Sequence, residues 1–369
     1  MRVLVVNAGS SSIKLRLLDA RDQVLVSEEL PPPADVDVRE ALSRFFARAS
    51  DVDAVGHRVV HGGREFTGPV RLDEAMDERL DRLADLAPLH NARSLISIRA
   101  TQQLRPDLPQ VACFDTSFHA TLPEESATYA VPWQWIERWA LRRYGFHGLS
   151  HAWASRRAAQ LIGRPVAELR LVTAHLGSGA SLAAVSSGRS VDTTMGFTPL
   201  DGLVMATRSG SVDPGLLLWL QQHGGLTAEA LERALDRESG LLGLSGRSSD
   251  LRVVLGAADQ GDGRAHLAYG VYLHRLRALI ASMAAAMGGM EGLVFTGGAG
   301  EGSARLRDDT CAGLEFLGVA IDDGRNDRTE PADRLLSPPA AATSVAVVAA
   351  REDIEIARQV RLLLDERAI

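Results

Sequence analysis

The chain has 369 residues, of which 46% are hydrophobic and 24% are charged, and its formal net charge is −7. This composition is typical of a globular protein and excludes fibrous and disordered classes. The acidic balance argues against a nucleic-acid partner, and the lack of a long apolar run argues against a membrane span. Two cysteines, Cys113 and Cys311, are too few for a disulfide framework, so we expect a cytoplasmic protein.

The beginning of the chain contains an unusual lysine. Lysine and arginine together number 40, and Lys14 is the single lysine among them. A compact ammonium acts as a point charge on a phosphate, which suits it to sites where the planar guanidinium of arginine does not fit. Lys14 lies in a strand-like run (residues 13–17) that follows another such run (residues 2–6) and a turn of glycine and serine. We interpret this hairpin as a phosphate contact, although an ordinary hairpin has the same pattern.

The order of these elements excludes two common nucleotide motifs. P-loops and dinucleotide-binding folds place a helix directly after the glycine turn, whereas a strand follows here. A similar hairpin recurs at residues 170–185, so we predict a duplicated α/β protein in which each half presents one phosphate turn. A third glycine segment, VFTGGAGEG (294–302), follows a predicted strand and precedes a predicted helix at residues 303–314. It is expected to let a purine lie against bare backbone.

Hydrophobic periodicity predicts the remaining elements. Helices are predicted at residues 38–49, 72–86, 92–104, 152–161, 228–236, 265–287 and 351–367. Strands are predicted at residues 54–60, 111–114 and 344–348. The last helix is amphipathic, and we expect it to pack on the first domain.

Charged side chains lie in glycine-flanked turns near the ends of predicted strands. Arg58, His147 and Arg208 occupy such turns, and Asp115 directly follows a buried run. Each one alone also fits a structural ion pair or hydrogen bond, but loops at strand ends commonly face ligands. Together they suit an anionic substrate and a phosphoryl group in transfer, for which an enzyme supplies positioning and charge neutralisation.

The sequence also contains candidate ligands for a metal ion. The sequence has no zinc-type spacing of cysteine and histidine. Magnesium needs only one or two oxygen ligands from the protein besides water and phosphate. Asn7 and Glu352 are candidates for those ligands.

The ordered motifs of this chain resemble those of the acetate kinase family over nearly the whole length. They are residues 7–14 (NAGSSSIK), 56–63 (GHRVVHGG), 88–91 (PLHN), 114–119 (FDTSFH), 143–148 (RYGFHG), 175–179 (HLGSG), 207–210 (TRSG), 248–252 (SSDLR), 295–301 (FTGGAGE) and 351–354 (REDI). This resemblance implies the superfamily of acetate and sugar kinases, heat-shock chaperones and actin. The expected fold is a duplicated, two-domain α/β fold, ribonuclease H-like or actin-like, with a nucleotide cleft between the domains. The expected domains are residues 1–118 with 354–369, and residues 119–353.

The resemblance also implies an activity. Such enzymes move a phosphoryl group reversibly and directly, in line, between ATP and acetate, giving acetyl phosphate and ADP. They work as homodimers with Mg²⁺, for which Mn²⁺ is an expected substitute. Neither a nucleic acid nor a membrane is an expected partner.

Roles carry over to this chain position by position. The resemblance implies that Asp115, His147 and Arg208 are catalytic and that Asn7 and Glu352 hold the metal. It implies that acetate pairs with Arg58 in a small pocket of Val60, Leu89, Phe146 and Pro199. The ATP site would comprise Lys14, His175, Leu176, Gly177, Ser178, Gly179, Asp250, Leu251, Arg252, Gly298, Ala299, Gly300, Glu301 and Gly302. The two methyl groups of Val60 are expected to crowd acceptors longer than acetate.

Three positions depart from the family pattern. The family usually has Asn at Ser178, Asp at Ser211 and Asn at Gly302. Ser178 keeps a hydroxyl for phosphate, Gly302 leaves nucleotide preference open, and Ser211 predicts a less well oriented Arg208. Three alternatives remain: a kinase of propionate or another short-chain carboxylate, a sugar kinase, and a nucleotide-binding relative without catalysis. The sugar kinase is disfavoured because it would need a more polar or larger acceptor pocket.

Overall fold

The computed structural model describes residues 1–9, 12–32, 35–49, 51–73, 76, 78–80, 88–330 and 332–365, with the backbone alone for residues 88–90. The chain divides into two compact units. Unit 1 comprises Met1–Ala120, Phe146–Trp153 and Arg351–Ile369, and unit 2 comprises Thr121–Gly145 and Ala154–Ala350. The domain boundaries expected from the sequence stay a prediction.

Unit 1 is built on a six-stranded sheet with the order β3-β2-β1-β4-β6-β5. Its strands are β1 (Val3–Ala8), β2 (Ile13–Leu18), β3 (Val24–Leu30), β4 (Ala54–Val59), β5 (Val70–Arg71) and β6 (Gln110–Phe114). The first three strands form an antiparallel meander, and β4 and β6 continue the sheet parallel to β1. The parallel strands consist almost entirely of buried residues, as expected where both faces of a sheet are covered.

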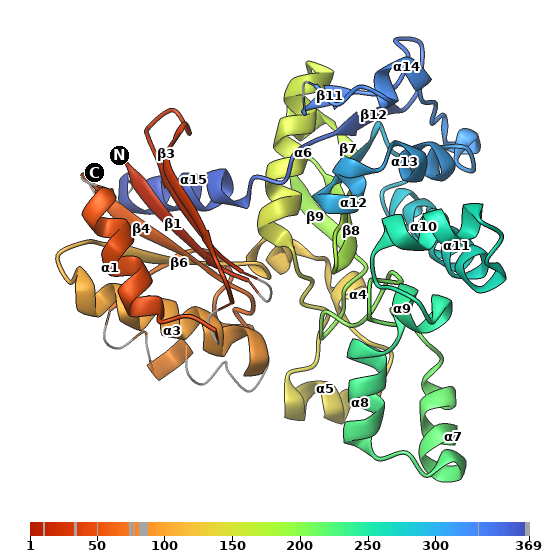
Figure 1. Cartoon of the computed structure of the whole chain (residues 1–369), viewed down its shortest axis with the longest axis horizontal. Helices are drawn as coiled ribbons and strands as arrows, with labels where there is room; N and C mark the ends of the chain where they lie inside the picture. Colours follow the sequence, from red (N-terminus) through yellow and green to blue (C-terminus); the bar gives the residue numbers. More distant parts are fainter. Residues whose placement is uncertain are drawn as a thin grey trace. The chain divides into compact units, whose positions relative to one another are not determined.

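Helices cover both faces of this sheet (Figure 1). They are α1 (Val38–Arg48), α3 (Pro88–Leu104) and α15 (Glu352–Asp365). Successive side chains of β1 point to opposite faces, so Leu4 and Val6 pack in the core with α1 and α3. Val3 and Val5 pack in the core with α15. The prediction that the last helix packs on the first part of the chain is therefore confirmed.

Unit 2 contains a second sheet with the same arrangement. Its order, given from the edge that corresponds to β3, is β9-β8-β7-β10-β12-β11. Its strands are β7 (Arg170–Leu176), β8 (Ala180–Ser186), β9 (Arg189–Thr193), β10 (Gly292–Thr296), β11 (Arg334–Leu335) and β12 (Ser344–Val347). Strands β7 to β9 form an antiparallel meander, and β10 and β12 run parallel to β7. Order and directions match unit 1 strand for strand, which confirms the predicted duplication.

The helices of unit 2 lie mostly in the second half of the chain. They are α4 (Glu124–Ala127), α5 (Trp133–Trp139), α7 (Pro214–Gly224), α8 (Ala228–Arg237), α9 (Gly240–Ser245), α10 (Leu251–Asp259), α11 (Gly263–Ala286), α12 (Gly297–Gly302), α13 (Ala304–Cys311) and α14 (Asp323–Asn326), and α6 (Gly148–Ile162) begins in unit 1. Asp250 and Asp262 cap α10 and α11 by accepting hydrogen bonds from backbone N–H groups of the first turn. None of the described helices combines the length and the hydropathy needed to cross a membrane.

Most predicted elements are confirmed with their ends shifted by a few residues. Strands at 54–60, 111–114 and 344–348 are β4, β6 and β12, and six of the predicted helices are α1, α3, α6, α8, α11 and α15. The predicted helix at 72–86 lies largely outside the described residues. The third glycine segment, predicted to connect a strand to a helix, itself forms the short helix α12 before α13.

Three buried histidines of unit 1 predict loss of stability in acid. Burial lowers the pKa of His57, His61 and His119 to about 4 from an ordinary value of 6.5. The unfolded chain therefore binds more protons than the folded chain between these values, and the free energy of unfolding falls as the pH drops below 6.5. At pH 5 each of these histidines should lower the free energy of unfolding by about 2 kcal/mol relative to pH 7.5. Urea unfolding at pH 7.5 and pH 5 measures this loss, which His57→Gln should reduce. Equal stability at both pH values would contradict it.

Candidate functional site

An ion pair between Arg58 and Asp115 lies at the carboxyl end of the parallel strands of unit 1. Because β4 and β6 are parallel neighbours, Arg58 in β4 comes next to Asp115, which follows β6. Arg58 Nε and Nη2 donate to the two carboxylate oxygens of Asp115 over 3.0 and 2.5 Å. Burial raises the pKa of Asp115, and the positive charge of Arg58 opposes that rise. This bidentate geometry fixes the orientation of both side chains.

Asn7 and Glu352 join the same cluster from opposite ends of the chain. Asn7 Nδ2 donates to Glu352 Oε2 over 2.8 Å, and Arg58 Nη1 donates to Asn7 Oδ1 over 3.3 Å. Glu352 Oε2 also lies 4.0 Å from Arg58 Nε. One amide oxygen and one carboxylate are hard donors of the kind that Mg²⁺ takes from a protein while keeping water and phosphate ligands. The donor set therefore fits magnesium, although the described residues contain no cluster of three or more acidic, histidine or cysteine side chains.

His147 occupies a strained backbone conformation beside Asp115. Its φ of 56° lies in the left-handed region, which is uncommon for residues other than glycine and is often maintained at functional sites. The backbone N–H of His147 donates to the Asp115 carboxylate, and Gly148 N donates to the Asp115 carbonyl oxygen over 3.0 Å. The turn of residues 147–148 thus fixes the backbone and side chain of Asp115 together.

This close approach requires glycine at position 148 and gives a prediction. A Cβ at Gly148 would lie 2.1 Å from Asp115 O and 2.8 Å from Phe118 Cβ. Gly148→Ala should therefore cost at least about 2 kcal/mol of stability and displace Asp115, lowering kcat. The control is Gly256→Ala in α10, where nothing lies within 4 Å of the new methyl group. That change should stabilise the chain by about 0.5–1 kcal/mol. Thermal unfolding and activity measure both, and a Gly148→Ala protein with wild-type kcat would refute the argument.

Lys14 lies on the same sheet as this cluster. The hairpin predicted at the start of the chain is confirmed, and Lys14 in β2 pairs directly with Asn7 in β1. Directly opposite residues in an antiparallel pair share one face of the sheet, so Lys14 stands beside Asn7. Its side chain is half exposed, and Nζ lies 4.0 Å from Glu29 Oε1. Ser10 and Ser11 of the turn lie outside the described residues.

Three of the four predicted acetate-pocket residues, Val60, Leu89 and Phe146, belong to unit 1. Val60 directly follows β4, and both Val60 and Phe146 are buried. The ring of Phe146 packs edge-on against His61, with ring centroids 5.5 Å apart. Pro199 belongs to unit 2, and the side chain of Leu89 lies outside the described residues.

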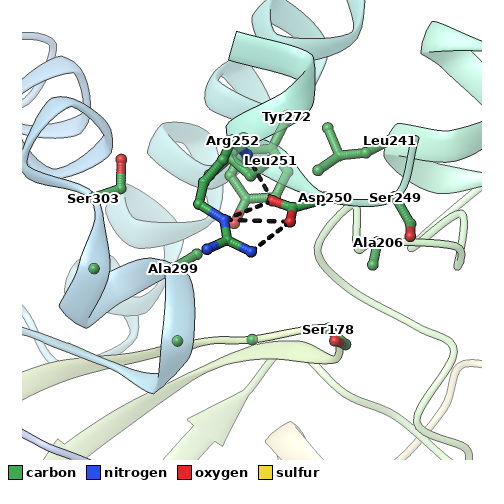
Figure 2. Close-up of a pocket in the computed structure, with 13 residues that line it drawn as sticks. Ser178, Ala206, Leu241, Ser249, Asp250, Leu251, Arg252, Tyr272, Ala299 and Ser303 are labelled. Carbon is green, nitrogen blue, oxygen red and sulfur yellow. Dashed lines mark hydrogen bonds and ion pairs between the residues drawn. The ribbon is translucent and has the colours of Figure 1, made fainter. Parts of the chain in front are cut away.

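Unit 2 contains a cavity of about 570 Å³ that collects most of the predicted ATP-site residues. The predicted residues that line it are Gly177, Ser178, Asp250, Leu251, Arg252, Gly298, Ala299 and Gly302. Figure 2 shows the Asp250–Arg252 pair at the start of α10 and Ser178 at the strand turn opposite. A side chain at Gly298 or Gly302 would meet nothing within 4 Å, so both glycines present open backbone. A cavity with one bare wall and a few polar groups is suited to a flat ring with a phosphate tail.

The other predicted ATP-site residues do not line this cavity. Lys14 belongs to unit 1, and His175, Leu176, Gly179, Gly300 and Glu301 are near the lining residues in sequence but not among them. Glu301 instead accepts hydrogen bonds from Gly297 N and Ala350 N, each over 2.9 Å. Its carboxylate therefore fastens α12 to the segment that follows β12.

Arg208 lies elsewhere in unit 2 and has a partner that the sequence did not reveal. Its Nε donates to Asp236 Oδ1 over 3.0 Å, and its Nη1 donates to Pro199 O over 3.2 Å. The serine at position 211 predicts a less well oriented arginine, yet a carboxylate contacts Arg208 from Asp236. Ser211 itself donates to Asp201 Oδ1 over 2.6 Å.

Sequence reasoning missed several residues of these sites. The cavity is also lined by Ala206, Leu241, Ser249, Tyr272 and Ser303. Ser249 and Ser303 directly adjoin predicted residues and could have been found by proximity. Tyr272 lies in α11, for which the sequence predicted a helix at residues 265–287 without a functional residue.

Comparisons with known proteins relate nearly the whole chain to one family. The model of the Acetokinase family matches residues 38–358. An acetate kinase of Nostoc sp. is 43% identical over 97% of this chain and 98% of its own length. An acetate kinase of Streptomyces coelicolor is 43% identical over 99% of this chain and 97% of its own length.

Solved structures give the same result. A crystal structure of Porphyromonas gingivalis acetate kinase has a TM-score of 0.90 and 36% identity, covering 98% of this chain and 99% of that one. A propionate kinase from Francisella tularensis has a TM-score of 0.88 and 35% identity, with coverage of 97% and 98%. The family match spans far more than half of the chain, and the curated relatives are similar over nearly their full length. This chain belongs to the Acetokinase family.

Proposed function

We propose that this chain is an acetate kinase, a phosphotransferase with a carboxyl group as acceptor. In the forward direction a carboxylate oxygen of acetate attacks the γ-phosphorus of ATP, and the bond to the β–γ bridging oxygen breaks. The products are acetyl phosphate and ADP. The observation that carries the proposal is the partly buried cluster of Asn7, Arg58, Asp115 and Glu352, assembled from the family's motifs in one unit.

The proposed roles divide between positioning and charge stabilisation. Arg58 pairs with the acetate carboxylate, and Asp115 holds that guanidinium and orients the acceptor. His147 and Arg208 stabilise the negative charge that develops on the transferring phosphoryl oxygens. Such electrostatic terms dominate phosphoryl transfer, in which the protein has little covalent chemistry to perform.

We assign the metal ligands to Asn7 Oδ1 and the Glu352 carboxylate, and Lys14 to the nucleotide phosphates. Bound Mg²⁺, or Mn²⁺ in its place, would neutralise charge on the phosphate oxygens. The hydrogen bond from Asn7 to Glu352 holds the two donors together beside Arg58. The ATP site is assigned to the 570 Å³ cavity and its glycine wall.

The acceptor pocket yields a prediction about substrate size. Val60 is proposed to contact the acetate methyl group, so Val60→Ala should admit one more methylene and lower the acetate-to-propionate ratio of kcat/KM about tenfold. Val59→Ala is the matched control, because Val59 packs in the core with Phe66 and Phe114. That control should lower Tm and leave the ratio unchanged. If Val60→Ala left the ratio at its wild-type value, the pocket assignment would be wrong.

Propionate is the second candidate acceptor, because a propionate kinase is among the similar structures. Purified protein with ATP and Mg²⁺ is offered acetate, propionate, butyrate or glycerol, and acyl phosphate is trapped as the hydroxamate. We expect acetyl hydroxamate in excess over propionyl hydroxamate. Propionyl hydroxamate in excess would favour the second candidate. Release of ADP with glycerol as acceptor, and with none of the carboxylates, would contradict a carboxylate kinase.

We also propose a cytoplasmic homodimer. Large apolar side chains are exposed on and around α5 and α7 of unit 2, namely Val131, Trp133, Trp135, Trp139, Val212, Leu216, Leu218 and Trp219. Apolar surface of this extent usually marks a protein interface. Light scattering should give twice the chain mass of 39.6 kDa. The variant with Trp133 and Trp219 both replaced by Glu should have the mass of a single chain. A wild-type protein with the mass of a single chain would contradict the proposed dimer.

A further inference from the structure

The loop that carries Arg208 is fastened to the last turn of α8. Thr207 Oγ1 donates to Asp236 O over 2.8 Å, and Ser209 N donates to Leu235 O over 3.0 Å. Ser239 N, just beyond the helix, donates to Thr207 O over 2.9 Å. Three hydrogen bonds therefore fix the backbone on both sides of Arg208 relative to the end of α8.

Asp236 contacts Arg208 from this fixed backbone. Its Oδ1 accepts from Arg208 Nε over 3.0 Å, and the second oxygen lies 3.7 Å from Nε of Arg237. Pro199 O accepts from Nη1 of Arg208 on the other side. Among the described residues Nη2 has no hydrogen-bond partner, so this nitrogen remains available to an anion. The guanidinium is thus held at Nε and Nη1, and Nη2 is left for a ligand.

The pair contributes little to folding. The Asp236 side chain is 39% exposed and that of Arg208 is 20% exposed, and ion pairs of this exposure are worth little in stability. A carboxylate in the last turn of a helix is also disfavoured by the helix dipole. Local stability therefore gives no reason for an aspartate at this position, whereas orientation of Arg208 does.

Residue 211 does not supply this contact. Ser211 Oγ donates to Asp201 Oδ1 and accepts from Gly202 N over 3.1 Å, and Ser211 N donates to Gly202 O. The serine is therefore part of the 201–202 turn. The carboxylate that contacts Arg208 belongs instead to Asp236 of α8.

We propose that Asp236 is a positioning residue that orients the Arg208 guanidinium for phosphoryl transfer. This inference rests on the proposed function, because it assigns Asp236 to the reaction through Arg208. Asp236 touches neither substrate nor the transferring group. Its effect should therefore appear in kcat and should vanish when Arg208 is absent.

A double-mutant cycle tests this dependence. Asp236→Asn should lower kcat about 10- to 30-fold, leave KM for ATP within about twofold and leave Tm nearly unchanged. Asp236→Glu should recover part of the lost kcat. Arg208→Ala combined with Asp236→Asn should be no slower than Arg208→Ala alone. Glu238→Gln is the matched control, since Glu238 is two residues away and pairs with Arg233 at 3.1 Å. It should keep wild-type kcat.

Two results would overturn the inference. One is a wild-type kcat in Asp236→Asn. The other is a double variant whose kcat is lower than that of Arg208→Ala by the same factor that Asp236→Asn alone causes. A crystal structure of Asp236→Asn adds a readout independent of turnover, because the Arg208 guanidinium should leave its present position. An unmoved guanidinium would refute the positioning role even if the acceptor proved not to be acetate. Failure of the wild-type protein to form any acyl phosphate would instead refute the proposed function.

Discussion

Arg208→Ala should lower kcat about 1,000-fold while KM for ATP stays within about threefold, because an arginine on a transferring phosphoryl group acts mainly in the transition state. The structure supports this asymmetry. Arg208 does not line the cavity assigned to ATP, and its Nε and Nη1 already have protein partners. Removing the side chain should therefore leave ground-state nucleotide binding nearly intact. Steady-state kinetics with varied ATP and acetate separate the two effects.

The control for this variant is another paired arginine of unit 2. Arg305 donates to Asp259 over 2.8 Å on the surface of α13 and lines none of the described cavities. Arg305→Ala should keep wild-type kcat and KM. A large rise in KM for ATP with unchanged kcat in Arg208→Ala would place that arginine in nucleotide binding and contradict its catalytic role.

Asp115→Asn should lower kcat about 100-fold, because the substitution keeps the size of the side chain and removes the charge that orients Arg58 and the acceptor. Stability should fall as well. The Arg58 side chain is only 14% exposed, and its nearest other carboxylate atom is Glu352 Oε2 at 4.0 Å. A buried guanidinium that loses its bidentate partner is strongly destabilising. Kinetics and thermal unfolding measure the two effects separately.

Asp107→Asn is the matched control for Asp115→Asn. Asp107 also forms a bidentate pair, accepting from Arg105 Nε and Nη2 over 2.9 and 2.7 Å, but its side chain is mostly exposed. This pair should contribute less than about 1 kcal/mol, and its loss should not affect kcat. Wild-type kcat in Asp115→Asn would remove this carboxylate from the proposed mechanism.

The duplicated fold could be predicted because each half begins with the same local pattern. The strand, glycine turn and strand at residues 2–17 and at residues 170–185 are hairpins, and short-range turn chemistry fixes both. The parallel strands β6, β10 and β12 were readable as short, mostly apolar runs. The strand order was not readable, since pairing between distant strands depends on which faces the helices cover.

The short helix α12 shows a limit of local reasoning. Its sequence is GGAGEG, and each glycine disfavours a helix interior by about 0.5–1 kcal/mol relative to alanine. Side-chain hydrogen bonds stabilise it: Glu301 accepts from Gly297 N at its start, and the buried Arg307 of α13 donates to the carbonyls of Gly300 and Glu301 at its end. Arg307 lies outside the glycine motif, so this contact could not be predicted from the motif.

The candidate site shows the same division between motif and partner. Asn7, Arg58, Asp115 and Glu352 could be named from their motifs, and the structure brings them within hydrogen-bond or ion-pair distance. Asp236 could not be named, because an acidic residue near the end of an amphipathic helix normally faces solvent. Its role follows from a loop docked against that helix, a contact between segments 28 residues apart.

Direct observation of the products tests the central claim, that this chain transfers a phosphoryl group from ATP to acetate. Wild-type protein is incubated with ATP, Mg²⁺ and acetate and followed by ³¹P NMR, with Asp115→Asn as the impaired control. We predict an acetyl phosphate resonance that grows in equal amount with ADP in the wild type and far more slowly in the variant. ADP accompanied by inorganic phosphate alone, at the same rate with and without acetate, would contradict the account.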